Sequence, residues 1–263
     1  MDLCKDYLSS NKATWNARTQ VHVASKFYDV SRFLNGASSL TEIETHELPD
    51  VNGKTLLHLQ CHFGLDSLSW ARKGAIVTGV DLSDSSIEKA SELASAINVD
   101  ARFICHDVYQ FGELVKPEFD IVFTSFGVIC WLPDLTLWAQ TIVNSLKPGG
   151  LFYMAEFHPF NDVVEGYGYF NRAQPDIEQE GTYTENCDGT EHTVVTWAHP
   201  ISDVINALLA AGLQLKHFNE FDYSPYNCFA GLSLDESSEV PRYQMIKNNQ
   251  AMPLVYSLSA IKL

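Results

Sequence analysis

Short apolar runs and amphipathic stretches alternate along the middle of the chain. Runs at 55–59, 76–80, 102–105, 119–124 and 151–155 are apolar or β-branched and predict five strands. Apolar residues at helical spacing follow the first, second and fourth runs, and predict helices near 65–73, 85–97 and 134–146. Repeated β-α units of this length predict a parallel sheet with helices on both faces, because parallel strands need crossover connections.

Polar residues mark the expected helix ends. Ser85 and Glu88 have the spacing of a capping box, Asp134 precedes an apolar helix, and Ser202 precedes another that Gly212 ends. These signals predict helix starts near 85, 134 and 202.

The ends of the chain depart from this rhythm. Residues 1–50 contain no convincing strand and predict an N-terminal helical cap, which leaves 51–263 as the main domain. An aromatic and acidic segment at about 157–200 is interpreted as an insertion that contains one strand near 191–197. Two last strands, 214–221 and 253–261, are separated by a polar loop and predict an antiparallel pair at the sheet edge.

Charge narrows the possible partners. The chain carries 17 Lys and Arg against 33 Asp and Glu, a net charge of −16 without any basic cluster, so a nucleic-acid partner is disfavoured. Nine acidic residues and one basic residue fall in 151–200, which suits either an amine ligand or a solvated face. No apolar run is long enough to span a membrane, and six scattered cysteines without a CxxC pair predict a cytoplasmic protein with reduced thiols.

Polar residues follow the predicted strands, at the sheet edge where open α/β sheets bind ligands. The segment 58–66 follows the first strand, Asp81 and Leu82 the second, Asp107 and Val108 the third, and Ser125 and Phe126 the fourth. An acid after the second strand can accept both hydroxyls of a ribose. Asp107 could accept from an adenine amino group, with Leu82 and Phe126 as apolar faces for the purine. The pattern predicts an adenosine site without a phosphate clamp.

These motifs resemble those of class I S-adenosylmethionine-dependent methyltransferases across about residues 50–263. The similar segments are the turn that ends at Gly64, Val80-Asp81-Leu82-Ser83, His106-Asp107-Val108, Phe119-Asp120-Ile121-Val122 and Leu146-Lys147-Pro148-Gly149-Gly150. The resemblance implies an α/β, doubly wound, Rossmann-like sheet of seven strands in the order 3-2-1-4-5-7-6, mostly parallel with the last strand antiparallel. It also implies that Asp81 binds the ribose, Asp107 and the Val108 amide bind the adenine edge, and Gly64 admits the methionine portion.

The turn after the first strand departs from the family pattern. The family usually has an acid at the position of His58 and glycines at those of Gln60 and His62. These three side chains could supply other polar contacts, and Arg18 could hold the methionine carboxylate as a bidentate partner. The predicted cofactor contacts are therefore His58, Gln60, His62, Gly64, Asp81, Leu82, Asp107, Val108, Ser125, Phe126 and Arg18.

The acceptor side of the site is less defined by sequence. Glu156 and His158 follow the fifth strand and are general-base candidates, or loop residues without a role in proton transfer. Trp15, Tyr28, Tyr223 and Tyr226 could form the walls of an acceptor pocket. The spacing of His58, Cys61 and His62 is metal-like, but no second cluster completes a set of four ligands, so no metal is expected.

The favoured function is methyl transfer from S-adenosylmethionine to a small-molecule acceptor. A non-catalytic protein that binds S-adenosylmethionine or S-adenosylhomocysteine is the first alternative, because the glycine-rich turn is altered. An NAD(P)-dependent oxidoreductase is the second, although GxGxxG is absent and Asp107 would then have no role.

Overall fold

A seven-stranded sheet organises the chain in the computed structural model, which describes residues 6–116 and 118–263. Its strands lie in the order β3-β2-β1-β4-β5-β13-β8, which confirms the predicted topology. β13 is antiparallel to both of its neighbours. The strands are β1 (Thr55–Leu59), β2 (Ile76–Asp81), β3 (Ala101–Cys105), β4 (Phe119–Ser125), β5 (Leu146–Phe157), β8 (Leu213–Phe221) and β13 (Val255–Lys262).

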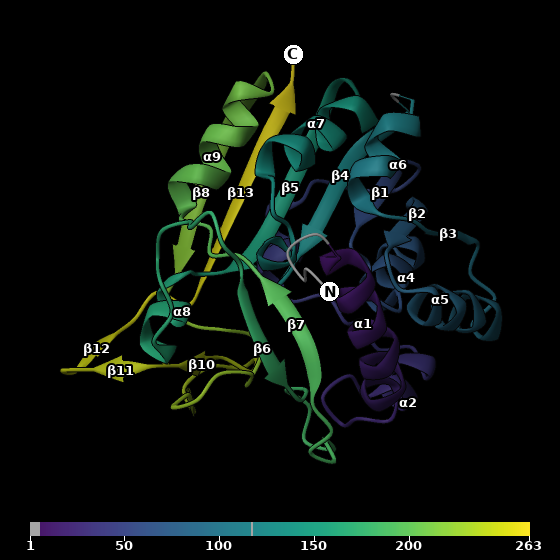
Figure 1. Ribbon diagram of the computed structural model, residues 1–263. Coiled ribbons are helices and arrows are strands. Elements are labelled where there is room, and N and C mark those ends of the chain that lie inside the picture. Colours follow the sequence, from purple (N-terminus) through teal and green to yellow (C-terminus); the bar gives the residue numbers. More distant parts are fainter. Residues whose placement is uncertain (1–5, 117) are drawn as a thin grey trace.

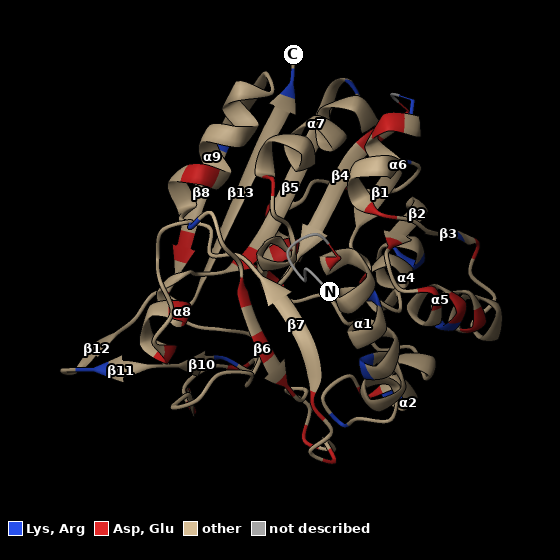
Figure 2. Cartoon of the chain, viewed as in Figure 1, with Lys and Arg blue, Asp and Glu red and all other residues tan. Residues whose placement is uncertain are grey.

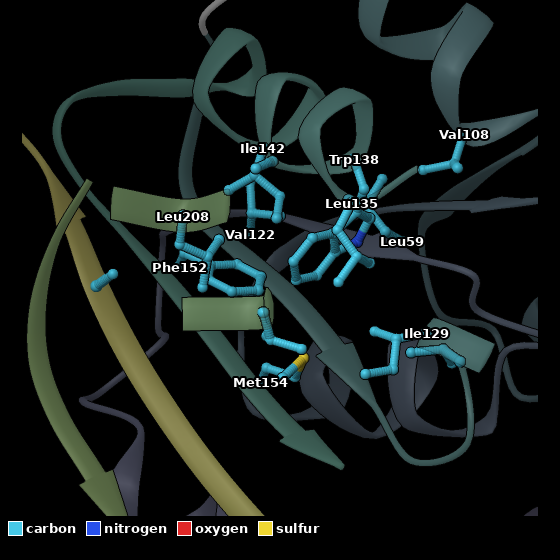
Figure 3. Packing of buried hydrophobic residues seen from close by; sticks show 14 of the residues in the cluster. Leu59, Val108, Val122, Ile129, Leu135, Trp138, Ile142, Phe152, Met154 and Leu208 are labelled. Atoms are coloured by element: carbon cyan, nitrogen blue, oxygen red, sulfur yellow. The ribbon is translucent and has the colours of Figure 1, made fainter. Parts of the chain in front are cut away.

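Helices cover both faces of the sheet because the strands are apolar on both sides. In β5, Phe152 and Met154 face one cluster while Tyr153 and Ala155 face the other. The first face packs against α6 (Val108–Leu114), α7 (Leu135–Ser145) and α9 (Ile201–Ala210), and Figure 3 shows Trp138 of α7 within this cluster. The second face packs against α3 (Glu42–Glu47), α4 (Leu65–Arg72) and α5 (Asp84–Ala96). No helix in the described part of the chain is long and apolar enough to cross a membrane.

The N-terminal segment and the insertion lie together at the carboxyl ends of the parallel strands (Figure 1). The N-terminal segment contains α1 (Tyr7–Val23) and α2 (Val30–Leu34), and the insertion contains the antiparallel hairpin β6 (Asp176–Glu180) and β7 (His192–Thr196). The buried Asn11 amide bonds both backbone groups of Val195, as donor at 2.8 Å and acceptor at 3.0 Å. The first five residues of the expected N-terminal cap lie outside the described residues.

Several local predictions differ from the structure. Ser83, rather than Ser85, is the N-cap of α5, and its side chain accepts from the Ser86 N–H. α9 begins at Ile201 after Pro200, so Ser202 lies inside its first turn. Proline at that boundary needs no backbone donor, which lets the helix start earlier.

The insertion and the last connection also contain more structure than predicted. β6 was not expected as a strand, and α8 (Phe160–Glu165) precedes it. The connection between β8 and β13 contains two small antiparallel pairs, and the 3-10 helix η1 follows β4. The short strands and η1 are β9 (Ser233–Leu234), β10 (Tyr243–Gln244), β11 (Ile246–Lys247), β12 (Gln250–Ala251) and η1 (Ile129–Trp131).

Candidate active site

A cavity of about 670 Å³ lies at the carboxyl ends of β1 to β4, bounded by α1 and the β6–β7 hairpin. Every residue predicted to contact the cofactor lines it, together with Trp15, Tyr28 and Tyr226. Three other predicted site residues, Glu156, His158 and Tyr223, do not line it. The structure therefore brings the strand-end residues of the sequence prediction to one enclosed space.

The turn after β1 keeps a glycine-like backbone although only one of its three left-handed residues is glycine. Gln60, His62 and Gly64 have φ angles of 58°, 50° and 79°. Such angles cost a residue with a side chain about 1 kcal/mol. The two substituted residues gain hydrogen bonds in return: Gln60 Nε2 donates to the Val128 carbonyl at 2.8 Å, and the His62 ring enters a buried network. The conformation of the turn is thus preserved while its side chains are new.

The His62 ring joins the turn to the N-terminal segment. Its Nε2 lies 2.8 Å from Nδ1 of His22 in α1, and its Nδ1 lies 3.1 Å from the Ser86 hydroxyl in α5. His22 Nε2 lies 2.6 Å from the Thr182 hydroxyl in the insertion. Burial lowers the pKa of His22 to about 3 and that of His62 well below its usual range. Both rings are therefore neutral, and each has one N–H to donate, which allows a continuous chain of hydrogen bonds.

The carboxylate of Asp81 lies at the end of β2 beside this turn. It accepts the backbone N–H of His62 at 2.8 Å and that of Ser83 at 2.9 Å. Burial is the main cause that raises the pKa of Asp81 to about 6, opposed by these hydrogen bonds. Each oxygen accepts one amide and keeps a second lone pair, so the carboxylate can also accept two ligand hydroxyls.

Asp107 has a similar position at the end of β3. Its Oδ1 caps α6 by accepting the N–H groups of Tyr109 and Gln110 at 3.1 and 3.0 Å. Its Oδ2 accepts no hydrogen bond from the described residues. Leu82 and Phe126 line the same cavity from the ends of β2 and β4. The acceptor groups that an adenosine needs are therefore present at the ends of the neighbouring strands β2 and β3, and Phe126 follows β4 on the other side of β1.

His58 and Arg18 line the cavity but are also held by the protein. His58 is 3% exposed, and its Nδ1 lies 2.8 Å from the Ser67 hydroxyl in α4. Burial lowers the pKa of His58 to about 3, so the ring is neutral. Arg18 donates from Nη2 to Glu180 at 2.9 Å and to the Gly181 carbonyl at 2.6 Å, while its buried Nε has no partner in the described residues. Arg18 thus ties α1 to the hairpin.

Aromatic side chains also line the cavity. The Tyr28 hydroxyl bonds that of Tyr183, and the Tyr226 ring meets Phe126 edge to face at 5.3 Å. Tyr223 instead donates to Glu42 at 2.9 Å, under the guanidinium of Arg242. Of the four predicted wall residues, the structure brings Trp15, Tyr28 and Tyr226 together and leaves Tyr223 elsewhere.

Glu156 and His158 are engaged in internal contacts. The Glu156 carboxylate accepts the backbone N–H groups of Gly127, Val128 and Ile129, the last two at 2.9 and 3.2 Å. Burial raises its pKa in spite of these bonds. His158 Nε2 lies 3.0 Å from Glu220, and its Nδ1 accepts the Phe160 N–H. These contacts give Glu156 a structural role, because it fixes the loop that follows β4.

One side of the cavity is acidic. Figure 2 shows acidic residues along β6, and the lining includes Asp162, Glu165, Asp176, Glu178 and Glu180. Several are paired: Glu180 with Arg18, Asp176 with Arg172 at 2.6 Å, and Glu178 with the Tyr167 hydroxyl at 2.6 Å. The acidic excess of residues 151–200 is therefore partly directed to the cavity.

Asp66 and Tyr183 are among the lining residues that were missing from the predicted site. Asp66 lies in the first turn of α4, directly after the glycine turn, where an acid near a helix N-terminus could have been recognised. Tyr183 lies in the loop between β6 and β7, and no pattern in the sequence distinguishes it.

Comparisons with known proteins agree with this geometry. Residues 56–150 match a family described as a methyltransferase domain. The ubiquinone biosynthesis O-methyltransferase of Coxiella burnetii (strain RSA 331 / Henzerling II) is 32% identical over 187 residues, 71% of this chain and 75% of that protein. Similar solved structures include S-adenosylmethionine-dependent methyltransferases from Clostridium acetobutylicum and Mesorhizobium loti. The first has a TM-score of 0.57 at 14% identity and covers 92% of this chain and 94% of that chain. The second has a TM-score of 0.55 at 19% identity and covers 87% of this chain and 100% of that chain.

The chain belongs to the class I S-adenosylmethionine-dependent methyltransferases. Its fold, its enzyme class and its cofactor are those that the sequence motifs predicted.

Proposed function

We propose that the chain transfers the methyl group of S-adenosylmethionine to a small-molecule acceptor inside the cavity. The observation that carries this proposal is the enclosure of the strand ends by α1 and the β6–β7 hairpin, around a cavity of about 670 Å³. A space of this size suits a cofactor and a small organic molecule. The Coxiella burnetii relative, named as an O-methyltransferase of ubiquinone biosynthesis, supports an acceptor of this class.

In this proposal the adenosine lies along the ends of β2, β3 and β4. Asp81 accepts the ribose hydroxyls, while Asp107 Oδ2 and the Val108 N–H meet the adenine edge. Leu82 and Phe126 contact the purine faces. The free carboxylate capacity of Asp81 and Asp107 is the feature that fits this group.

The methionine portion lies at the turn after β1. Gly64, Gln60 and His62 give the turn its shape, Ser125 lines the cavity from the end of the neighbouring strand β4, and Arg18 lines it with a buried Nε that has no partner in the described residues. The neutral His58 bonds Ser67 and so joins β1 to α4, the two elements that flank the turn.

When bound, S-adenosylmethionine would supply a methyl group on a sulfonium sulfur: a bond from the acceptor atom to the methyl carbon would replace the carbon–sulfur bond, and S-adenosylhomocysteine would be the leaving product. The protein's contribution is to hold the acceptor beside that methyl group and to exclude water. Trp15, Tyr28 and Tyr226 form the walls that would orient the acceptor. Glu156 acts as a positioning residue, because it fixes the loop from Gly127 to Ile129 at the cavity edge.

The test is product formation. The purified enzyme is incubated with S-adenosylmethionine and sets of phenols, amines, thiols and carboxylic acids, and S-adenosylhomocysteine is quantified. Release that depends on one set of small molecules is expected. Activity only on protein or nucleic-acid acceptors would refute the proposal. A Trp15→Ala variant that retains cofactor binding but loses turnover would place the acceptor against α1.

A further inference from the structure

Asp66 is an acidic residue that lines the cavity. It lies in the first turn of α4, next to Leu65, which follows the N-cap Gly64. Its Oδ1 accepts the Ser39 hydroxyl at 2.6 Å, and its Oδ2 accepts the Ser125 hydroxyl at 3.1 Å. No Lys, Arg or His in the described residues forms an ion pair with it. The two serines orient the carboxylate but leave its charge uncompensated.

An uncompensated carboxylate in a cavity favours a cationic ligand. Removal of a charge from water is costly unless an opposite charge or hydrogen-bond donors replace the solvent. Burial raises the pKa of Asp66, while the hydroxyls of Ser39 and Ser125 oppose that shift. An ammonium group bound against it would complete the site with two charge-assisted hydrogen bonds.

The position of Asp66 in the fold indicates which part of a bound ligand would carry the ammonium group. Strand order places β2 on one side of β1 and β4 on the other. Asp81 ends β2, and Asp66 is bonded to Ser125, which ends β4. A ligand whose ribose is held by Asp81 and whose remaining part crosses the β1 turn therefore reaches Asp66.

We infer that Asp66 binds the α-ammonium group of the methionine portion of the cofactor. The inference rests on the proposed cofactor orientation. His58 lies near the same turn on β1, but its buried ring is neutral and supplies no charge. Instead its Nδ1 bonds Ser67, the neighbour of Asp66 in α4, so His58 holds the helical turn from which the carboxylate projects. The acid of this site therefore lies at the start of α4 and not on β1.

Calorimetric titration with two ligands tests this assignment. S-adenosylhomocysteine carries the ammonium group, whereas 5′-methylthioadenosine has the same nucleoside thioether without the amino-acid part. Asp66→Asn is expected to weaken binding of S-adenosylhomocysteine about 10- to 100-fold, the effect of losing a charged hydrogen bond. Binding of 5′-methylthioadenosine should change less than about threefold.

Matched variants guard against a structural effect. Asp84→Asn removes an exposed carboxylate from the first turn of α5 and should leave both affinities unchanged. Ser125→Ala removes one hydroxyl that orients Asp66, and should weaken S-adenosylhomocysteine alone, by about two- to fivefold. Equal weakening of both ligands by Asp66→Asn, or no weakening, would overturn the assignment. If the unaltered protein bound neither ligand, the proposed function itself would fail.

Discussion

The left-handed turn at Gly64 offers a quantitative test of how the cofactor end of the sheet is built. Gly64 has φ +79°, and a Cβ there would lie 2.8 Å from Phe103 Cε1 and 2.9 Å from Ala90 Cβ. A Gly64→Ala change therefore combines backbone strain of about 1 kcal/mol with overpacking of roughly 1–3 kcal/mol. The expected loss in the free energy of unfolding is about 3 kcal/mol.

Gly53 provides the matched control. Its φ is +73°, nearly that of Gly64, but a Cβ would have nothing within 4 Å. Gly53→Ala should therefore cost only the backbone term, about 1 kcal/mol. Urea unfolding of both variants measures the difference. Equal losses for the two variants would refute the close packing of the turn against Phe103, whereas an excess of about 2 kcal/mol for Gly64→Ala would support it.

Three further changes test other parts of the structure. Glu156→Gln should lower the free energy of unfolding by about 2–3 kcal/mol, because an amide replaces a carboxylate that accepts four backbone N–H groups; an unchanged urea midpoint would contradict this anchoring role. Asn11→Ala should cost about 2 kcal/mol and speed limited proteolysis of the hairpin, because both backbone groups of Val195 lose their partner; unaltered cleavage would show that α1 and the hairpin are held by other contacts. The pKa of His58 is about 3 in the folded protein against an ordinary value of 6.5, so unfolding takes up protons below pH 6.5 and the protein should lose about 2 kcal/mol between pH 7 and 5 from this residue. Urea unfolding at both pH values should show a smaller loss in His58→Gln, and identical losses would mean that His58 is not buried as a neutral ring.

The order of the sheet could be predicted from sequence because each signal was local and repeated. Apolar runs of strand length alternate with helical spacing, and turn residues such as Gly74 separate them. The acids Asp81 and Asp107 could be assigned to the site because they directly follow strands whose carboxyl ends share one edge. Because β2 and β3 are neighbours in the parallel sheet, the residues that follow them lie close together.

The contacts that close the cavity could not be predicted in this way. The hydrogen bonds of Asn11 to Val195 and of His22 to Thr182 join residues that are 184 and 160 positions apart. Neither has a local signature. Glu156 was interpreted as a base candidate because it stands near the ligand end of β5, but its side chain lies under the loop that follows β4. The direction of a single side chain depends on such tertiary contacts rather than on its position along the strand.

The turn after β1 is a second place where the sequence alone could not predict the side-chain contacts. From the sequence, Gln60 and His62 were interpreted as residues that could supply other polar contacts where the family usually has glycines. The backbone nevertheless retains positive φ at both residues, and their side chains bond Val128 and His22. The effect of the substitutions is to link the turn to its surroundings while the backbone shape is kept.

We expect the strand-end acids to form an adenosyl site in which Asp81 binds the ribose. Calorimetric titration of the purified, ligand-free protein with S-adenosylhomocysteine, with NAD as the control ligand and Asp81→Asn as the control variant, tests it most directly. We expect micromolar binding of S-adenosylhomocysteine, no binding of NAD, and an affinity at least about tenfold weaker in Asp81→Asn with its fold intact. Absence of S-adenosylhomocysteine binding, or unaltered affinity in the folded variant, would contradict it.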